Sequence, residues 1–274
     1  MGNIRFEEAV PRIRAAVQRH LTWNNLRLMR DWVKEPLAIF AAVYMGAAAL
    51  AQPFYVPSGS MQPTLGIGDL LIATKFSYGY SRYSLPFSSG PTPAQQLFAS
   101  LPKPGDVVVF RKPNDTSKTL VKRVVGLPGD RIQMISGRLW INGRELALRP
   151  DGYGKVEDGP GEAAPGAYFD ADRFVETLPN GREHRIFKKT WGAFYDDTRE
   201  VVVPPGHVFV MGDNRDDSAD SRVSPLENGV GFLPAAKIVG RAQLVIASVD
   251  FVNADGLWEW PLQFRVGRVL TRVR

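Results

Sequence analysis

The sequence predicts a mainly β protein: an all-β domain with an inserted irregular β lobe, preceded by one N-terminal transmembrane helix. Two observations carry this prediction. First, apart from tyrosines, no ionisable side chain lies between Glu35 and Asp69. Second, beyond Tyr55 the chain falls into short β-branched segments bounded by Gly or Pro, which is typical of strands.

Composition supports a folded protein and excludes some chemistry. Of the 274 residues, 44% are hydrophobic and 23% are charged, which argues against a disordered chain. The net charge of +6 favours an anionic partner. The arginines are scattered and no nucleic-acid-binding pattern is present, so we expect a lipid bilayer and no nucleic acid. With no cysteines, thiol catalysis, disulfides and thiolate metal sites are excluded.

The first element expected is a membrane anchor over residues 36–54, "PLAIFAAVYMGAAALAQPF". A helix of about 20 residues spans the roughly 30 Å of hydrocarbon in a bilayer. Residues 1–35 are rich in arginine, so the positive-inside rule predicts that they stay in the cytoplasm. Two alternatives remain. The run could be a buried core helix, or a cleaved signal peptide, since "ALAQ" at 49–52 looks like a cleavage site.

Residues 55–274 are expected to form the remaining, catalytic domain. Its strands are predicted at 106–110, 119–127, 207–213 and 237–249. Ser136-Gly137 and Asn142-Gly143 predict tight turns. Residues 151–166 are rich in Gly, Pro, Asp and Glu, which indicates an exposed loop. The less hydrophobic stretch from about 131 to 203 is therefore predicted to be the inserted lobe.

A serine-rich loop, "YVPSGSMQPTLGIGD" at 55–69, follows the apolar run. Two prolines and a glycine around Ser58 and Ser60 fix a non-helical backbone that can hold a hydroxyl at one place. A serine becomes nucleophilic only when a neighbouring base takes its proton. The histidines have no motif around them and are expected to be surface or turn residues: His20, His184 and His207.

Lys122 is the better candidate base. It lies in "TLVKRVVGLPGD" among apolar residues, on the same predicted strand face as Leu120 and Val124. Burial among apolar groups lowers a lysine pKa and makes the neutral amine available. Serine with neutral lysine is a known variant of the hydrolytic dyad. The alternative is a lysine whose ammonium reaches solvent at a strand edge.

A third polar stretch, "MGDNRDDSADSR" at 211–222, follows a predicted strand. A calcium loop is one alternative, because five oxygen-bearing residues have EF-hand spacing: Asp216, Ser218, Asp220, Ser224 and Glu227. Ser221 stands where that loop needs glycine, and Pro225 lies within it. We therefore expect no metal.

Together, "PSGSMQPTL", "KRVVGLPGD" and "GDNRDDSADSR" resemble the boxes of bacterial type I signal peptidases, also called leader peptidases. The resemblance runs from about Phe54 to Ala247. It implies a membrane-bound serine endopeptidase with a Ser-Lys dyad on an all-β fold and no cofactor. Such enzymes remove signal peptides from exported preproteins at the outer face of the cytoplasmic membrane, after small residues at −1 and −3.

The resemblance also implies roles for individual residues. Ser60 corresponds to the nucleophile and Lys122 to its general base. The Ser58 hydroxyl and the Ser60 backbone N–H would form the oxyanion hole. The supporting residues would be Ser218, which orients the lysine, and the ion pair of Asp220 and Arg222. The substrate pockets would be lined by Val56, Met61, Leu65 and Val121.

Two departures and two other functions stay open. The family often has an aromatic pair and a glycine where this chain has "VSPLENGVGFLP", and some members carry a second anchor. A dedicated Ser-Lys processing peptidase for a single substrate, such as a pilin, is one alternative. An anchored β-domain binding protein is the other. The C-terminal segment predicts either an amphipathic interfacial helix or a tail packed on the domain.

Overall fold

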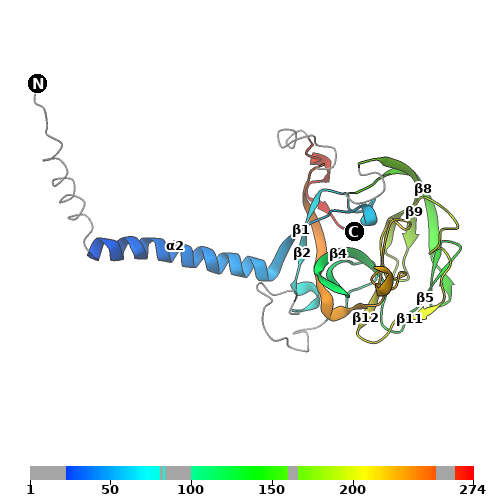
Figure 1. Cartoon of the computed structure of the whole chain (residues 1–274), viewed down its shortest axis with the longest axis horizontal. Coiled ribbons are helices and arrows are strands. Elements are labelled where there is room, and N and C mark those ends of the chain that lie inside the picture. The colour runs from blue at the N-terminus through cyan, green and yellow to red at the C-terminus, as the bar shows by residue number, and fades with distance from the viewer. Residues whose placement is uncertain (1–22, 81–82, 84–99, 160–165, 251–262) are drawn as a thin grey trace, which may run out of the picture. The chain divides into compact units, whose positions relative to one another are not determined.

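The computed structural model describes residues 23–80, 83, 100–159, 166–250 and 263–274. The chain divides into two compact units, Met1–Ala48 and Ala49–Arg274 (Figure 1).

Most of helix α2, Trp23–Leu50, lies in the first unit; the helix has 28 residues and includes Pro36. The predicted boundaries of 36–54 are wrong at the C-terminal end, because residues 51–55 form a strand. Pro53, which cannot donate a helical hydrogen bond, lies in that strand. Within the described residues, no helix is long and apolar enough to cross a membrane. The predicted transmembrane helix is therefore not found.

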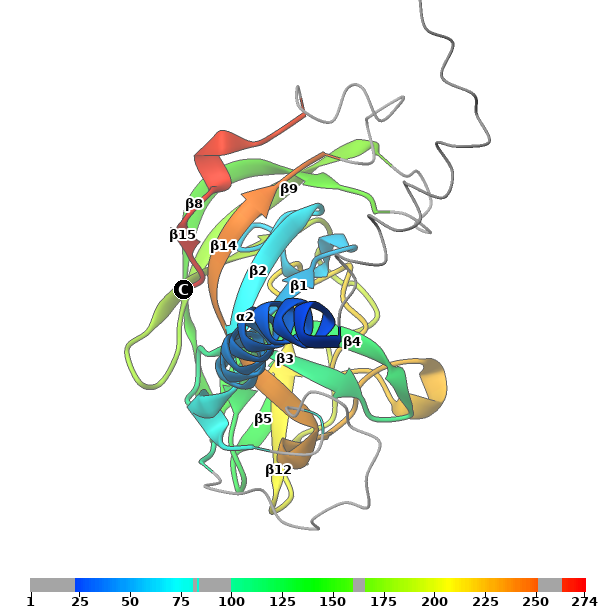
Figure 2. The ribbon, with the colours of Figure 1, turned by 90° about the vertical axis from the view of Figure 1, so that its left-hand side faces the viewer.

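The second unit is mainly β, as predicted. Its largest sheet has eight strands in the order β1-β2-β14-β3-β4-β12-β13, with β15 paired to β14 (Figure 2). The strands are β1 (Ala51–Tyr55), β2 (Asp69–Thr74), β3 (Val107–Lys112), β4 (Asp115–Gly126), β12 (His207–Met211), β13 (Leu233–Pro234), β14 (Ile238–Ser248) and β15 (Thr271–Arg272). The pairings in this sheet are antiparallel.

The chain between β4 and β12 forms two further antiparallel sheets. The strands are β5 (Arg131–Ile135), β6 (Arg138–Ile141), β7 (Arg144–Glu145), β8 (Ala147–Glu157), β9 (Tyr168–Thr177), β10 (Glu183–Lys188) and β11 (Val201–Val202). They pair in the orders β10-β9-β8 and β11-β5-β6-β7. The expectation of an irregular lobe is therefore wrong. Residues 151–157, predicted as loop, belong to β8, because their backbone pairs with β9.

Two glycine turns confirm the sequence prediction within this region. Ser136 and Gly137 have φ of 49° and 76°, and Asn142 and Gly143 have φ of 54° and 76°. Two successive positive φ values suit the turn that joins adjacent antiparallel strands, and Asn and Gly tolerate them best. These turns connect β5 to β6 and β6 to β7.

The C-terminal segment is not an amphipathic helix. Val266–Arg268 is a single 3-10 turn, and Thr271–Arg272 is strand β15, paired with β14. Val273 is buried in a core cluster, so this end of the tail packs on the domain. Trp258 and Trp260 lie outside the described residues.

The core lies on both faces of the large sheet. Val107 and Val109 of β3 join one buried cluster, whereas Val108 and Phe110 join another, as alternation along a strand requires. Met61 and Leu65 of the serine loop are 1% and 0% exposed and belong to the first cluster. Full burial of such a side chain stabilises the fold by about 1.5–3 kcal/mol. The serine loop is thereby fixed against the sheet.

Candidate active site

Ser60 lies in a 3-10 turn, Gly59–Met61, that follows β1. Asn214 holds this turn from the other side: its backbone N–H donates to Ser60 O at 3.2 Å, and its Nδ2 donates to Gly59 O at 3.2 Å. Because Met61 is buried beneath the turn, contacts on two sides fix the position of the Ser60 hydroxyl.

Gln62 fixes the turn to the β8 end of the neighbouring sheet. Its Nε2 donates to Glu157 O at 3.0 Å, and its Oε1 accepts from Glu157 N–H at 3.1 Å. The side-chain amide thus bonds to the N–H and C=O of one residue, as the backbone of a neighbouring strand would. A Cβ on Gly59 would lie 2.8 Å from Glu157 O, so only glycine allows this close approach.

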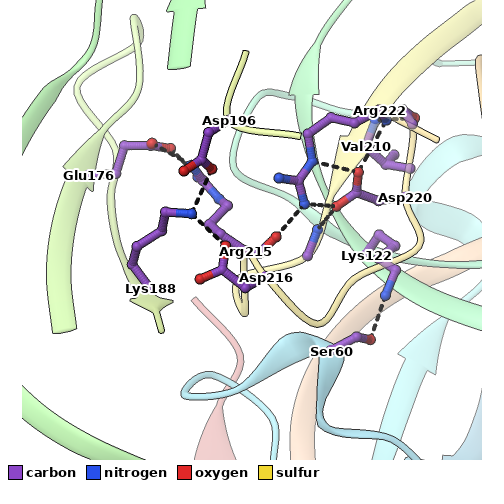
Figure 3. A network of polar contacts seen from close by, with 12 residues as sticks. Ser60, Lys122, Glu176, Lys188, Asp196, Val210, Arg215, Asp216, Asp220 and Arg222 are labelled. Carbon is purple, nitrogen blue, oxygen red and sulfur yellow. Dashed lines mark hydrogen bonds and ion pairs between the residues drawn. The ribbon is translucent and has the colours of Figure 1, made fainter. Parts of the chain in front are cut away.

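Lys122 lies on β4 opposite Val108, and its Nζ donates a hydrogen bond to Ser60 Oγ (Figure 3). The side chain is 3% exposed. Burial lowers the pKa of Lys122 to about 8; Asp220 opposes this shift, Arg222 adds to it, and Asp213 opposes it. The neutral amine is therefore accessible within one or two pH units of neutrality. The structure brings the two predicted dyad residues together.

Ser58 lies on the same side of the turn as the hydroxyl of Ser60. Its Oγ is 3.4 Å from Ser60 Oγ. Ser58 has extended backbone angles of φ −133° and ψ 155° and directly precedes the 3-10 turn. The two groups predicted to bind an oxyanion, the Ser58 hydroxyl and the Ser60 N–H, therefore belong to one rigid loop. Their role stays a prediction.

The ion pair of Asp220 and Arg222 is present and buried. Arg222 Nη2 lies 2.9 Å from Asp220 Oδ2, and Arg222 Nε donates to Oδ1 at 2.9 Å (Figure 3). Burial acts to raise the pKa of the Asp220 carboxyl, but Arg222 and the Gly212 N–H hold it below its usual value. Asp220 is thus a fixed negative charge in the field of Lys122.

Ser218 lies beside the serine turn but does not make the predicted hydrogen bond. Its Oγ is buried and has no hydrogen-bond partner among the described residues. A Cβ on Gly212 would lie 2.3 Å from Ser218 Oγ and 2.5 Å from Ser60 O. Gly212 therefore leaves the room that lets Ser218 and Ser60 approach each other.

The predicted pocket residues lie together, mostly within the core. Val56, Met61 and Leu65 are at most 3% exposed, and Val121 is partly buried against the same cluster. They form the floor beneath the serine loop. In this structure Val121 alone among them offers appreciable surface to a substrate.

Sequence reasoning missed a second buried ion pair next to the dyad. Arg123 follows Lys122 and therefore points to the opposite face of β4. Its Nη2 lies 2.7 Å from Asp213 Oδ2, and the same nitrogen donates to Thr64 Oγ1 at 3.2 Å. The sequence did contain a signal for this pair. Arg123 lies inside the hydrophobic segment "LVKRVV", and a buried charge needs a partner of opposite charge.

Two further buried pairs surround the polar stretch at 211–222. Arg215 Nη2 lies 2.6 Å from Glu176 Oε2. Lys188 Nζ lies 2.6 Å from Asp196 Oδ1 and also pairs with Asp216 (Figure 3). Two carboxylates with calcium-loop spacing are therefore paired with basic side chains. Asp216 pairs with Lys188, and Asp220 pairs with Arg222. Within the described residues, no cluster of metal-binding side chains is found.

The histidines differ from expectation in one case. His184, expected at the surface, is 6% exposed, and burial together with Arg123 and Arg215 lowers its pKa well below the usual value. The strand β10 that carries it packs inward at this position. His207 lies in a turn region, where its Nδ1 is 2.9 Å from Pro205 O. His20 lies outside the described residues.

Comparison with known proteins gives one consistent family. The model described as "Signal peptidase, peptidase S26" matches residues 29–247. Signal peptidase I of Rickettsia typhi is 40% identical over 78% of this chain and 80% of its own length. That of Rickettsia akari is 39% identical over 81% and 80%. A signal peptidase I crystal structure from Enterococcus faecalis covers 52% of this chain and 97% of its own, with 22% identity and a TM-score of 0.29.

Proposed function

The chain belongs to the signal peptidase family, peptidase S26, and from this premise we propose that it removes N-terminal signal peptides from exported preproteins. Family membership makes it a serine peptidase. In this proposal Ser60 is the nucleophile and Lys122 is its general base. The hydrogen bond between Lys122 Nζ and Ser60 Oγ is the single observation that carries these roles.

The chemistry runs as acyl transfer through Ser60. The lone pair of neutral Lys122 takes the Ser60 proton while Oγ attacks the scissile carbonyl carbon. The Ser58 hydroxyl and the Ser60 N–H stabilise the resulting oxyanion. The lysine ammonium then gives its proton to the leaving amine, and the signal peptide remains as an ester on Ser60. Water, deprotonated by Lys122, hydrolyses that ester.

Three residues support Lys122 in the proposed reaction. The charge on Asp220 stabilises the ammonium that forms, and Arg222 keeps Asp220 ionised. Ser218 Oγ, buried without a partner next to the turn, is available to accept a hydrogen bond from that ammonium. Ser218 would then hold the amine in line with Ser60 Oγ during the proton transfer.

The proposed substrate preference follows from the apolar residues beneath the serine loop. Val56, Met61 and Leu65 are almost fully buried, so in this proposal the subsites above them are shallow and apolar. Alanine-sized side chains at −1 and −3 fit such a surface, whereas leucine would clash with residues that cannot move away. Cleavage after small residues is therefore proposed, with Val121 as the side wall.

The proposed location is the cytoplasmic membrane, with residues after about Phe54 on the outer face. Large apolar residues of α2 are exposed, and an exposed apolar patch indicates a lipid or protein contact. They include Trp32, Val33, Leu37, Ile39, Phe40 and Tyr44. The cationic residues before Glu35 favour a cytoplasmic N-terminus. Signal peptides and the bilayer would then be the partners.

The test uses the full chain in detergent and several unrelated preproteins. Mass spectrometry should find one cut per substrate, directly after the small-x-small sequence, and Ser60→Ala should abolish it. A −1 leucine should prevent cutting. Cleavage of a single substrate would favour a dedicated processing peptidase, and no cleavage by the wild type would contradict the proposal.

A further inference from the structure

A cavity of about 550 Å³ lies beside the serine loop, where Pro63 and Thr64 form part of its wall. The rest of the wall comes from β8, β9, β10 and the C-terminal segment. Six arginines line it: Arg149, Arg173, Arg185, Arg268, Arg272 and Arg274. Among the described residues, two acidic side chains do so, Asp151 and Glu183. We refer to this space as the arginine cavity.

Part of this charge is held in place by acids. Asp151 Oδ2 accepts from Arg173 Nε at 2.9 Å and from Arg185 Nε at 2.8 Å, so one carboxylate serves two guanidinium groups. Arg268 pairs with Asp69, which lies outside the wall. These contacts fix the orientation of three arginines. They leave the cavity with an excess of positive charge.

The other three guanidinium groups have no acidic partner. Within the described part of the chain, no ion pair joins Arg149, Arg272 or Arg274 to a carboxylate. Like charges that share one cavity repel each other, and a bound anion would relieve that repulsion. Guanidinium groups also present several N–H donors in a fixed plane, which suits oxyanions better than it suits chloride.

His184 also lines the arginine cavity and is 6% exposed. Its Nε2 lies 3.4 Å from Glu176 Oε2, whereas its Nδ1 has no hydrogen-bond partner among the described residues. Burial, together with Arg123 and Arg215, lowers the pKa of this imidazole well below its usual value. The ring is therefore neutral, and its resonance reports on an anion that enters the cavity beside it.

We propose that the arginine cavity binds a phosphate group, supplied either by a small phosphate ester or by a phospholipid headgroup. A phosphate presents at least three acceptor oxygens on one atom and carries up to two charges, whereas a peptide carboxylate presents two oxygens and one charge. Three guanidinium groups without acidic partners match the phosphate better. This inference does not depend on the proposed peptidase activity, because binding is measured directly.

The experiment uses histidine nuclear magnetic resonance on the full chain in detergent. The sequence has three histidines, so labelled imidazoles give few signals. Inorganic phosphate is titrated at constant ionic strength, with chloride as the balancing anion. We expect a saturable shift of one imidazole, assigned to His184 because His184→Gln removes it. If that variant does not fold, removing His20 and His207 assigns the same signal by elimination.

Matched variants then locate the site. Arg149→Gln with Arg272→Gln should raise the phosphate concentration at half-saturation at least tenfold. Arg138→Gln with Arg144→Gln removes the same charge from exposed positions outside this cavity and should change it less than twofold. Glycerol 3-phosphate and soluble dihexanoyl phosphatidylglycerol, compared in the same titration, distinguish a free ester from a lipid headgroup by which binds more tightly.

Three results would overturn the proposal. They are the absence of a saturable shift with every phosphate probe, an equal effect of the two double variants, and tighter binding of an aspartate-rich peptide than of any phosphate. The last result would assign the cavity to acidic peptide segments instead.

Discussion

The side-chain amide of Gln62 forms two hydrogen bonds with the backbone of Glu157, 95 residues further along the chain. The contact joins the serine loop to strand β8. It restricts the turn that carries Ser60 in addition to the bonds from Asn214.

Replacing Gln62 with methionine should lower both stability and activity. The side-chain volume is kept, but two hydrogen bonds to the Glu157 backbone are lost, each worth about 0.5–1.5 kcal/mol. We expect a lower melting temperature and about tenfold lower kcat/KM, because the Ser60 turn gains freedom. Gln133→Met removes a side-chain bond to the backbone of Thr198 in the β11-β5-β6-β7 sheet, which does not carry the dyad. It should lower stability while kcat/KM stays unchanged.

Lys122→Arg should be as inactive as Ser60→Ala. Arginine keeps the charge but is effectively never deprotonated, so it cannot take the Ser60 proton. Members of a catalytic unit are not additive, and the double variant should be no worse than either single one. Lys118→Arg, on the exposed part of the same strand, is the control and should retain full turnover. Substantial activity in Lys122→Arg would exclude the dyad.

Activity should rise as the pH passes through about 8, the pKa to which burial lowers Lys122. The neutral amine is the base, and it appears above that pH. The unfolded lysine titrates near 10.5, so between these values the unfolded state binds more protons. The free energy of unfolding should therefore increase with pH across this window, and Lys122→Met should remove that increase. A turnover rate that is highest in acid would contradict this assignment.

Asp220→Asn should move the onset of activity to lower pH. Asp220 raises the pKa of Lys122, so removing its charge makes the amine lose its proton more easily. The variant should also be less stable, because Arg222 is left buried without its acid. Asp196→Asn breaks a comparable buried pair with Lys188 and should lower stability without moving the pH profile. If both variants had the same pH profile of activity, Asp220 would have no effect on the pKa of Lys122.

Gly212→Ala should abolish activity. The added Cβ would lie 2.3 Å from Ser218 Oγ and 2.5 Å from the Ser60 carbonyl oxygen. Contacts below 3 Å force movement, and one of these atoms is backbone in the serine turn. Gly267→Ala meets no atom within 4 Å and should retain wild-type turnover. Steady-state kinetics and thermal unfolding of both variants measure the difference.

Membrane attachment gives a separate prediction. If the exposed apolar residues of α2 contact lipid, the wild type should stay with membranes in alkaline carbonate, and Ile39→Arg with Phe40→Arg should release it. Tyr153→Arg with Phe194→Arg changes exposed aromatics elsewhere and should not. Protease added outside spheroplasts should digest the domain after Phe54. Protection there would contradict the proposed topology.

Short β-branched segments bounded by Gly or Pro were enough to predict the mainly β fold, and the three ordered motifs selected Ser60 with Lys122. Alternation along β4 placed Lys122 among apolar residues but left a lysine that reaches solvent as the alternative. The Asp220–Arg222 pair came from the resemblance, and the structure contains it.

Other features depended on long-range packing, which a sequence pattern does not encode. The end of α2 depends on the pairing of β1 with β2, and strand β8 passes through a Gly- and Pro-rich stretch because β9 pairs with it. His184 was expected at the surface since nothing local to it reveals the inward face of β10. The unpartnered state of Ser218 depends on the close approach at Gly212.

Arg215 has a consequence for attempts to shorten the protein. It belongs to the same polar loop as Asp220 and Arg222, and Arg222 Nη2 donates to its carbonyl at 2.7 Å. Its own charge is neutralised by Glu176 on strand β9. A minimal enzyme that lacks residues 131–203 would lose Glu176, the carboxylate that pairs with the Arg215 guanidinium. A trimmed scaffold would therefore need Arg215 replaced together with the deletion.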